Sequence, residues 1–274
     1  MNRYPTVLTI AGSDSGGGAG IQADIKTISA LGAYSCTAIT AITAQNTLGV
    51  RSIQGVEPSV LKDQIEAVFE DFTIDAVKTG MLYSKVSVEI VGESLKKFRP
   101  RFFVLDPVMV STSGSKLITD DAIQAVKEFL FPLATVITPN IFEAEILTGV
   151  AVKSPEDMEK AAVKLLQSGC NAVLIKGGHL SGNESVDMLF EKGKESYGIH
   201  SPFIETKNTH GTGCTLSAAI ASCLALGKDL SEAFVLAKDY INSALYAGKD
   251  VEVGKGHGPV NHFFDPKRLE VFEL

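Results

Sequence analysis

Short runs of β-branched and apolar residues alternate with amphipathic stretches along most of the chain, and this alternation restricts the fold more than any other feature. The strand-like runs are TVLTIAG (6–12), CTAITAIT (36–43), DAVKTG (75–80), FFVLDPV (102–108), TVITPN (135–140) and AVLIKGG (172–178). Between them, apolar residues recur at helical spacing, at Ile21, Ile25 and Ile28 and again at Leu61, Ile65, Val68 and Phe72. Strands that alternate with such helices predict a mostly parallel sheet covered by helices on both faces.

The pattern changes after residue 184. The segment SVDMLFEKGKESYGIHSPFI (185–204) has two strand-like halves around a glycine-containing turn at 192–194, which predicts an antiparallel hairpin that extends the sheet. Two helical stretches follow, at about 214–226 and 231–247, before a glycine-rich tail. Because no repeat or linker interrupts the 274 residues, we expect one domain over 1–274.

Composition and charge exclude several classes of protein. Hydrophobic residues make up 45% of the chain and charged residues 21%, as in soluble globular proteins, and no apolar run reaches the roughly 18 residues that a membrane helix needs. The net charge of −7 disfavours nucleic acid as a partner. The four cysteines lie far apart without CxxC spacing, which argues against a zinc site or a disulfide framework. We therefore expect a cytoplasmic protein that binds small molecules.

A glycine-rich loop follows the first strand, where open α/β sheets collect their ligands. Its glycines permit close approach of a ligand to the backbone at a helix start. The segment GAGIQA (18–23) matches a loose dinucleotide fingerprint, but the acidic residue expected about 20 positions later is missing. A P-loop is excluded, because no G-x-x-x-x-G-K-[ST] sequence occurs in the chain.

A second glycine turn, NTHGTGCT (208–215), leads into an uncharged helix. Backbone N–H groups and the positive end of a helix dipole at Gly211 and Gly213 would form a site for an anion such as phosphate. The same field would depress the pKa of Cys214, which could then accept a proton or position a hydroxyl group. The alternative is a small buried thiol used for packing.

Seven segments carry a family resemblance in chain order: AGSDSGGGAGIQADIKT, TAQNTLGV, KTGML, DPVM, TPNIFEAE, KGGH and THGTGCT. Together they resemble the hydroxymethylpyrimidine/phosphomethylpyrimidine kinases of thiamine biosynthesis, which belong to the ribokinase-like superfamily. The resemblance implies a three-layer α/β/α sandwich around a mostly parallel sheet. It also implies ATP-dependent phosphorylation of 4-amino-5-hydroxymethyl-2-methylpyrimidine, and then of its monophosphate to the diphosphate.

The resemblance assigns the catalytic turn. The family's anion hole corresponds to the GTGC turn, from Gly211 through Thr212 and Gly213 to Cys214, whose backbone N–H groups stabilise the charge on the transferred phosphoryl group. Many superfamily members carry Asp as the base at the position of Cys214, whereas the pyrimidine kinases carry Cys, as this chain does. Cys214 is thus implied to activate or to orient the substrate hydroxymethyl oxygen, and the sequence does not decide between these roles.

The resemblance also implies residues for ATP and Mg²⁺. Asn140 and Glu143 match an N-x-x-E pattern in which the carboxylate supports magnesium, commonly through water. Asp106 is a second candidate near the metal. Lys176 would neutralise the triphosphate as a point charge, and Thr212 and Gly213 would contact the nucleotide. The alternatives are a helix N-terminal acid for Glu143 and a solvated lysine at a strand end for Lys176.

For the pyrimidine, Gln45 and Asp24 are the predicted polar contacts. A Gln amide offers both a donor and an acceptor to an aminopyrimidine, and Asp24 would accept from an amino or hydroxyl group. Four small or apolar residues are implied to pack around the ring: Gly12, Ala19, Met81 and Val108. Plain core positions are the alternative for Met81 and Val108. His179 and His210 lie where they could approach ATP and receive no chemical role.

Two other functions compete with this interpretation. A pyridoxal kinase of the same superfamily would phosphorylate the hydroxymethyl group of pyridoxal, and Gln45 favours the pyrimidine over it. A non-catalytic nucleotide- or vitamin-binding protein is disfavoured, because the glycine turn, Cys214, Asn140, Glu143 and Lys176 occur together. The family resemblance further implies a homodimer.

Overall fold

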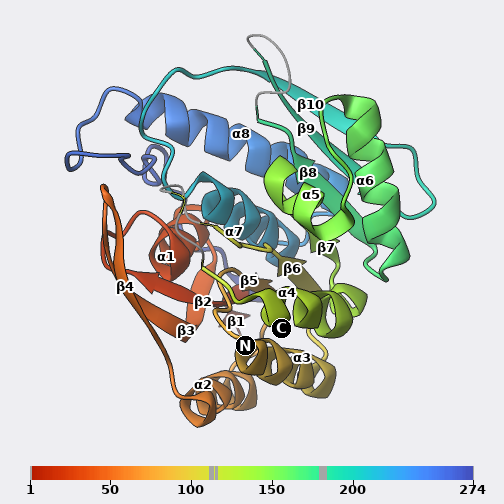
Figure 1. The fold of residues 1–274 in the computed structure, drawn as a ribbon. Helices are drawn as coiled ribbons and strands as arrows, with labels where there is room; N and C mark the ends of the chain where they lie inside the picture. The colour runs from red at the N-terminus through yellow and green to blue at the C-terminus, as the bar shows by residue number, and fades with distance from the viewer. Residues whose placement is uncertain (1, 111–113, 115–116, 179–183, 274) are drawn as a thin grey trace.

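The computed structural model describes residues 2–110, 114, 117–178 and 184–273, and a twisted sheet runs through its centre (Figure 1). Within the described residues this sheet has nine strands, in the order β10-β9-β8-β7-β6-β5-β2-β3-β4. Their bounds are β2 Thr6–Asp14, β3 Tyr34–Asn46, β4 Gly49–Gly55, β5 Ala76–Thr79, β6 Phe102–Leu105, β7 Val136–Ile137, β8 Ala172–Lys176, β9 Glu184–Glu191 and β10 Tyr197–Pro202. A separate pair, β1 Asn2–Arg3 and β11 Phe272–Glu273, joins the two ends of the chain.

The six central strands pair in parallel with one another: β2, β3, β5, β6, β7 and β8. At the two edges of the sheet the pairing is antiparallel, with β4 on β3, β9 on β8 and β10 on β9. The predicted hairpin is confirmed as β9 and β10. Strand β4 was not predicted, because its sequence GVRSIQG carries few apolar residues and the strand lies at an edge of the sheet. The carboxyl ends of the parallel strands share one edge, which is where a ligand site is expected.

Helices cover both faces of the sheet (Figure 1). One hydrophobic cluster joins the sheet to α1 Gly20–Ala30, α7 Thr212–Ala225 and α8 Leu230–Gly248. The other joins it to α2 Pro58–Asp71, α3 Lys85–Phe98, α4 Asp120–Ala125, α5 Ile141–Thr148 and α6 Pro155–Gln167. The described residues therefore form the three layers that the sequence predicted, and that prediction is confirmed. The extent of the domain over 1–274 stays a prediction.

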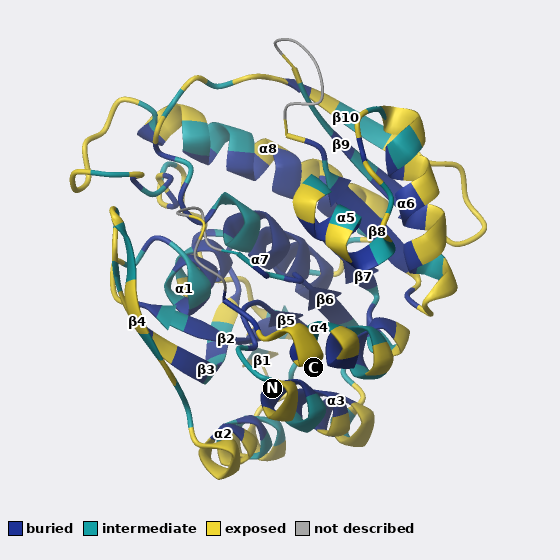
Figure 2. Ribbon diagram, in the orientation of Figure 1, coloured by how far each residue is buried: buried dark blue, intermediate teal, exposed yellow. Residues whose placement is uncertain are grey.

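Helix α7 is mostly buried, as Figure 2 shows. Every residue from Thr215 to Ala225 is buried, which its small and apolar side chains allow. By contrast, Ile25 and Phe72 are 37% and 38% exposed, so the predicted buried stripes are wrong at these two positions. In α1 the buried face includes Asp24 in place of Ile25, because Asp24 has a charged partner in the interior.

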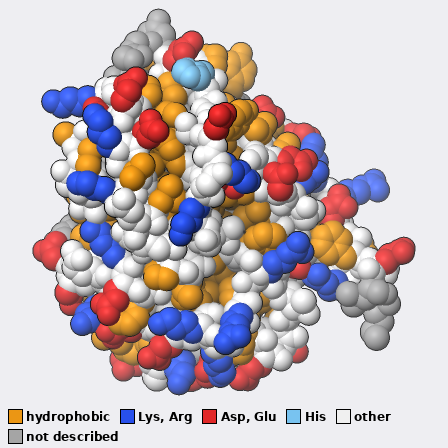
Figure 3. Space-filling view, turned by 90° about the vertical axis from the view of Figure 1, so that its right-hand side faces the viewer, with side chains coloured by type: hydrophobic (Ala, Val, Ile, Leu, Met, Phe, Trp, Pro, Cys, Tyr) orange, Lys and Arg blue, Asp and Glu red, His pale blue; other side chains and the backbone are white. Residues whose placement is uncertain are grey.

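On the outside, Figure 3 shows Lys and Arg side chains interspersed with Asp and Glu side chains over one face of the molecule. None of the helices in the described residues is long and apolar enough to cross a membrane. The cytoplasmic location and the homodimer stay predictions.

Candidate active site

A cavity of about 330 Å³ opens at the carboxyl edge of the parallel strands. The ends of β2, β3 and β8 and the N-termini of α5 and α7 contribute to its wall. The predicted site residues that line it are Gly12, Ala19, Gln45, Met81, Asp106, Val108, Asn140, Glu143, Lys176, Gly211, Thr212, Gly213 and Cys214. The structure thus brings together every predicted site residue except Asp24. His179 lies outside the described residues.

The turn before α7 has the geometry of an anion site. Gly211 is the N-cap, with a φ of 82° that favours glycine, and its carbonyl accepts from the Thr215 N–H at 2.9 Å. The first-turn N–H groups of a helix have no carbonyl partner inside the helix. Here the Thr212 N–H donates to the Thr209 carbonyl at 3.3 Å, and Thr212, Gly213 and Cys214 line the cavity. A Cβ on Gly211 would lie 1.8 Å from the Gly18 carbonyl oxygen, so the turn packs directly on the first glycine loop.

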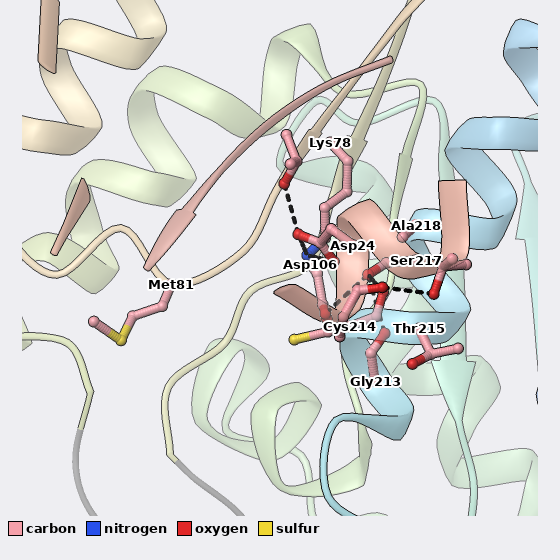
Figure 4. A network of polar contacts seen from close by, with 12 residues as sticks. Asp24, Lys78, Met81, Asp106, Gly213, Cys214, Thr215, Ser217 and Ala218 are labelled. Atoms are coloured by element: carbon pink, nitrogen blue, oxygen red, sulfur yellow. Dashed lines mark hydrogen bonds and ion pairs between the residues drawn. The ribbon is translucent and has the colours of Figure 1, made fainter. Parts of the chain in front are cut away.

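Cys214 lies half-buried at the start of α7, near Asp24, Asp106 and Ser217 (Figure 4). Burial raises the pKa of its thiol to about 11; Lys78 opposes this shift, and the two carboxyl groups add to it. The predicted depression of the pKa is therefore wrong for the free protein, because the thiol loses more hydration than the nearby positive charge restores. At neutral pH the thiol is protonated, which suits a group that orients a hydroxyl better than one that removes its proton.

Asp24 does not line the cavity. Its side chain is fully buried, both its carboxylate oxygens lie 2.9 Å from the Lys78 Nζ, and the Thr9 hydroxyl donates to it at 2.6 Å. The predicted direct contact with substrate is thus corrected: the carboxylate belongs to an ion pair behind the cavity wall. Burial raises the pKa of Asp24 against the pull of Lys78. Burial also opposes the charge of Lys78, but Asp24, Cys214 and Asp106 together outweigh it and raise the pKa of Lys78. We take the pair as ionised, because three donor contacts converge on one carboxylate.

Lys176 and Asp106 form a second charged pair beside the anion site. The Lys176 Nζ lies 2.9 Å from Asp106 Oδ1 and 4.0 Å from Glu143 Oε2. A Cβ on Gly213 would lie 3.3 Å from the same Nζ, so the ammonium group adjoins the turn. Burial opposes the charge of Lys176, but the two carboxyl groups outweigh it and raise its pKa. Lys176 therefore carries a positive charge beside the Gly211–Cys214 turn.

Asn140 and Glu143 form a capping box at the start of α5. The Asn140 side chain accepts from the Glu143 N–H, and Glu143 Oε2 accepts from the Asn140 N–H, both at 2.8 Å. The N-x-x-E pattern thus has the structural role that the sequence left open for Glu143. Burial raises the pKa of Glu143 to about 7, with Lys176 opposing and Asp106 adding to the shift.

The donor set fits a magnesium ion that arrives with a nucleotide. Asp106 and Glu143 both lie within reach of Lys176, yet the described residues contain no group of three or more metal-ligating side chains. Mg²⁺ in nucleotide sites keeps several waters and takes only one or two carboxylates plus phosphate oxygens. A buried carboxyl group with a raised pKa also favours a neighbouring cation, because the cation would replace its proton.

Gln45, Gly12, Ala19, Met81 and Val108 also line this cavity. A Cβ on Gly12 would lie 3.0 Å from the Met81 Cε, so glycine leaves the thioether room at the wall. Apolar side chains at Ala19, Met81 and Val108 thus line the same cavity as the polar side chains of Gln45 and Thr43, a mixture that is usual in small-molecule sites.

Asp14 and His210, for which the sequence predicted no chemical role, also line this cavity. The Asp14 carboxylate accepts N–H bonds from Gly16, Gly18 and Ala19 and lies 2.9 Å from the His210 Nε2. Burial works against its charge, but His210 and the backbone donors lower the pKa of Asp14 overall. The sequence feature that could have identified Asp14 is its position at the end of β2, since functional side chains gather at strand ends.

A second cavity of about 310 Å³ adjoins the first and shares Asn140, Lys176, Thr212 and Gly213 with it. Its remaining wall comes mainly from β9, α7, α8 and the segment after β10, with Ile204, Leu216 and Ile241 among the apolar residues. Two cavities that meet at a turn of backbone N–H groups provide room for a donor and an acceptor of a phosphoryl group on opposite sides of that turn.

The family model for phosphomethylpyrimidine kinase matches residues 14–261. The chain belongs to this family. It is 49% identical over 257 residues to a hydroxymethylpyrimidine/phosphomethylpyrimidine kinase from Rhizobium meliloti, covering 93% of this chain and 96% of the relative. It is 51% identical to a thiamine biosynthesis bifunctional protein from Geobacter sulfurreducens, of which it spans only 52%. The family that the sequence motifs indicated is confirmed.

Two solved structures bear on the substrate. A phosphomethylpyrimidine kinase from Clostridium difficile is 48% identical with a TM-score of 0.77, covering 88% of this chain and 99% of that one. A Staphylococcus aureus pyridoxal kinase, solved with AMP-PCP and pyridoxal, is 35% identical with a TM-score of 0.87, covering 99% of this chain and 100% of that one. Backbone shape therefore relates this chain to both enzymes, and sequence identity favours the pyrimidine kinases.

Proposed function

We propose that this chain transfers the γ-phosphoryl group of ATP to the hydroxymethyl group of 4-amino-5-hydroxymethyl-2-methylpyrimidine, and then a second phosphoryl group to the monophosphate. One observation carries the proposal: the Gly211–Cys214 turn separates a cavity with the Gln45 amide from a second cavity that shares Lys176. The names of the Rhizobium and Geobacter relatives support the same activity and its place in thiamine biosynthesis.

In this proposal each residue has a limited task. The Cys214 thiol orients the acceptor hydroxyl at the start of α7, and the backbone N–H groups of the Gly211–Cys214 turn hold the charge that spreads over the transferred phosphoryl oxygens. Lys176 adds a positive charge on the nucleotide side. Magnesium, when bound with ATP, would neutralise phosphate charge, and Asp106 and Glu143 are the residues that would hold it, commonly through water.

Measurement of ADP release tests the activity. Purified protein with ATP and Mg²⁺ should release ADP on addition of the hydroxymethylpyrimidine, with two ADP per pyrimidine when both phosphorylations occur. A rate on pyridoxal alone would identify a pyridoxal kinase, the function that the Staphylococcus aureus structure favours. No ADP release with either compound would leave a non-catalytic binding protein.

A variant separates chemistry from nucleotide binding. Cys214→Ala removes the thiol but keeps the backbone N–H groups, so kcat should fall far more than the affinity for ATP. If the turnover of this variant equals that of the wild type, Cys214 only packs against its neighbours and has no part in the reaction.

A further inference from the structure

The side-chain amide of Gln45 has mismatched hydrogen-bond partners on both sides, and turning the amide by half a turn corrects both. Gln45 Nε2 lies 3.2 Å from the His210 Nε2, and Gln45 Oε1 lies 3.1 Å from the Thr43 hydroxyl. The oxygen and nitrogen of a Gln amide are distinguished by their hydrogen-bond partners, since the two atoms have nearly the same size. The partners therefore decide which way the amide faces.

His210 settles one side of the amide. Its Nε2 lies 2.9 Å from Asp14 Oδ2, and that carboxylate also accepts N–H bonds from Gly18 and Ala19. An ionised carboxylate only accepts, so the His210 Nε2 must carry a proton and donate it to Asp14. A protonated ring nitrogen has no lone pair for an N–H group, so Gln45 Nε2 has no acceptor there, whereas Gln45 Oε1 can share the N–H that His210 directs mainly to Asp14.

Thr43 settles the other side independently. Its hydroxyl lies 3.0 Å from the Ser13 carbonyl oxygen as well as 3.1 Å from Gln45. A hydroxyl has one proton, so with an oxygen at Gln45 it can satisfy only one of its two neighbours. With the Gln45 nitrogen at Thr43, the hydroxyl donates to the Ser13 carbonyl and accepts from Gln45, and both contacts are satisfied. A half-turn of the amide removes both conflicts at once.

We propose that His210, held by Asp14, and Thr43 together lock the Gln45 amide with its oxygen toward His210 and its nitrogen toward Thr43, and so determine which ring edge the site accepts. This inference rests on the proposed function. The amide keeps one free N–H and one free lone pair, and Gln45, Thr43 and His210 all line the cavity. A ligand must present a donor on the His210 side and an acceptor on the Thr43 side.

The amino group and adjacent ring nitrogen of an aminopyrimidine provide this pattern. With its hydroxymethyl group held toward Cys214, a 4-oxo pyrimidine has a carbonyl beside a ring N–H and presents the reverse, which would set acceptor against acceptor and donor against donor. A free amide could turn to accept either ring, whereas a locked amide rejects the reversed one. His210 and Thr43 are therefore positioning residues for specificity, and neither needs to touch the reacting oxygen.

The experiment compares dissociation constants for 4-amino-5-hydroxymethyl-2-methylpyrimidine and its 4-oxo counterpart, by calorimetry without ATP. The wild type should prefer the amino compound, and the preference should fall at least about tenfold in His210→Leu and in Thr43→Val, as expected when a buried hydrogen-bond pattern is relaxed. Thr43→Val keeps the side-chain shape, so it guards against a folding defect. The matched control is His257→Leu, because His257 is exposed and lies outside the cavity lining.

The outcomes are distinct. An unchanged preference in both variants, with the amino compound still bound, would overturn the lock and leave the proposed function standing. A wild type that binds neither compound would overturn both. A reduced preference in both variants, with His257→Leu unchanged, supports the lock, because a loss of stability alone would weaken both ligands equally.

Discussion

Replacing Lys78 with methionine should destabilise the protein strongly. Lys78 and Asp24 are both fully buried, and the ammonium lies 2.9 Å from each carboxylate oxygen. Lys78→Met would leave a buried carboxylate without its counter-charge, close to a second carboxyl group at Asp106. Removal of one partner from such a pair costs about 3–5 kcal/mol in the free energy of unfolding, roughly a hundredfold to a few thousandfold in the unfolding constant.

Urea denaturation of the ligand-free protein measures this cost. The double variant Lys78→Met/Asp24→Asn removes both charges and keeps an acceptor for the Thr9 hydroxyl, so it should regain most of the lost stability. The matched surface control is Lys97→Met, which breaks an exposed pair with Glu66 at 2.8 Å and should leave the urea midpoint unchanged within error. A single variant as stable as the wild type, or a double variant no better than the single one, would refute the reasoning.

Three further predictions concern the site. With a pKa of about 11, Cys214 should react with iodoacetamide at pH 8 about a hundredfold more slowly than an ordinary thiol. The rate should rise with pH until about pH 11. A plateau of the rate near pH 8 would contradict the effect of burial on this thiol. The folded-state pKa of Glu143, about 7, lies above its unfolded value, so its contribution to stability is present below about pH 4.3 and is lost as the pH rises through 7. The wild type should therefore lose about 3 kcal/mol in unfolding free energy between pH 4.3 and 8 that Glu143→Gln does not lose. The same pH dependence of stability in both proteins, measured by urea titration, would count against this. Gly211→Ala places a Cβ against the Gly18 carbonyl and should lower kcat/KM at least about a hundredfold. The control Gly227→Ala has a φ of 89° and open space around its Cβ, so it should cost only about 1 kcal/mol of backbone strain. Similar activity in the two variants would contradict a catalytic role for the turn.

Much of the fold followed from local patterns. The parallel strands and most helices have the periodicity of their secondary structure, and the strand-end rule placed Gln45, Asp106 and Lys176 at one edge, where the structure has them. Strand β4 escaped prediction because an edge strand without an apolar face has no periodic signal. The roles of the cavity residues in catalysis and binding stay predictions, although their common location was foreseen.

The sequence by itself determined the layer order, the glycine turns, the family and the set of residues that meet at the cavity, because periodicity, backbone freedom and motif order are local properties of the chain. Only the tertiary structure decided what those side chains experience. Asp24 faces Lys78, which is 54 residues away, Cys214 loses its hydration, and Gln45 meets His210 across 165 residues. Desolvation and hydrogen-bond partnership depend on atoms that are close in space and far apart in sequence, so no local pattern records them.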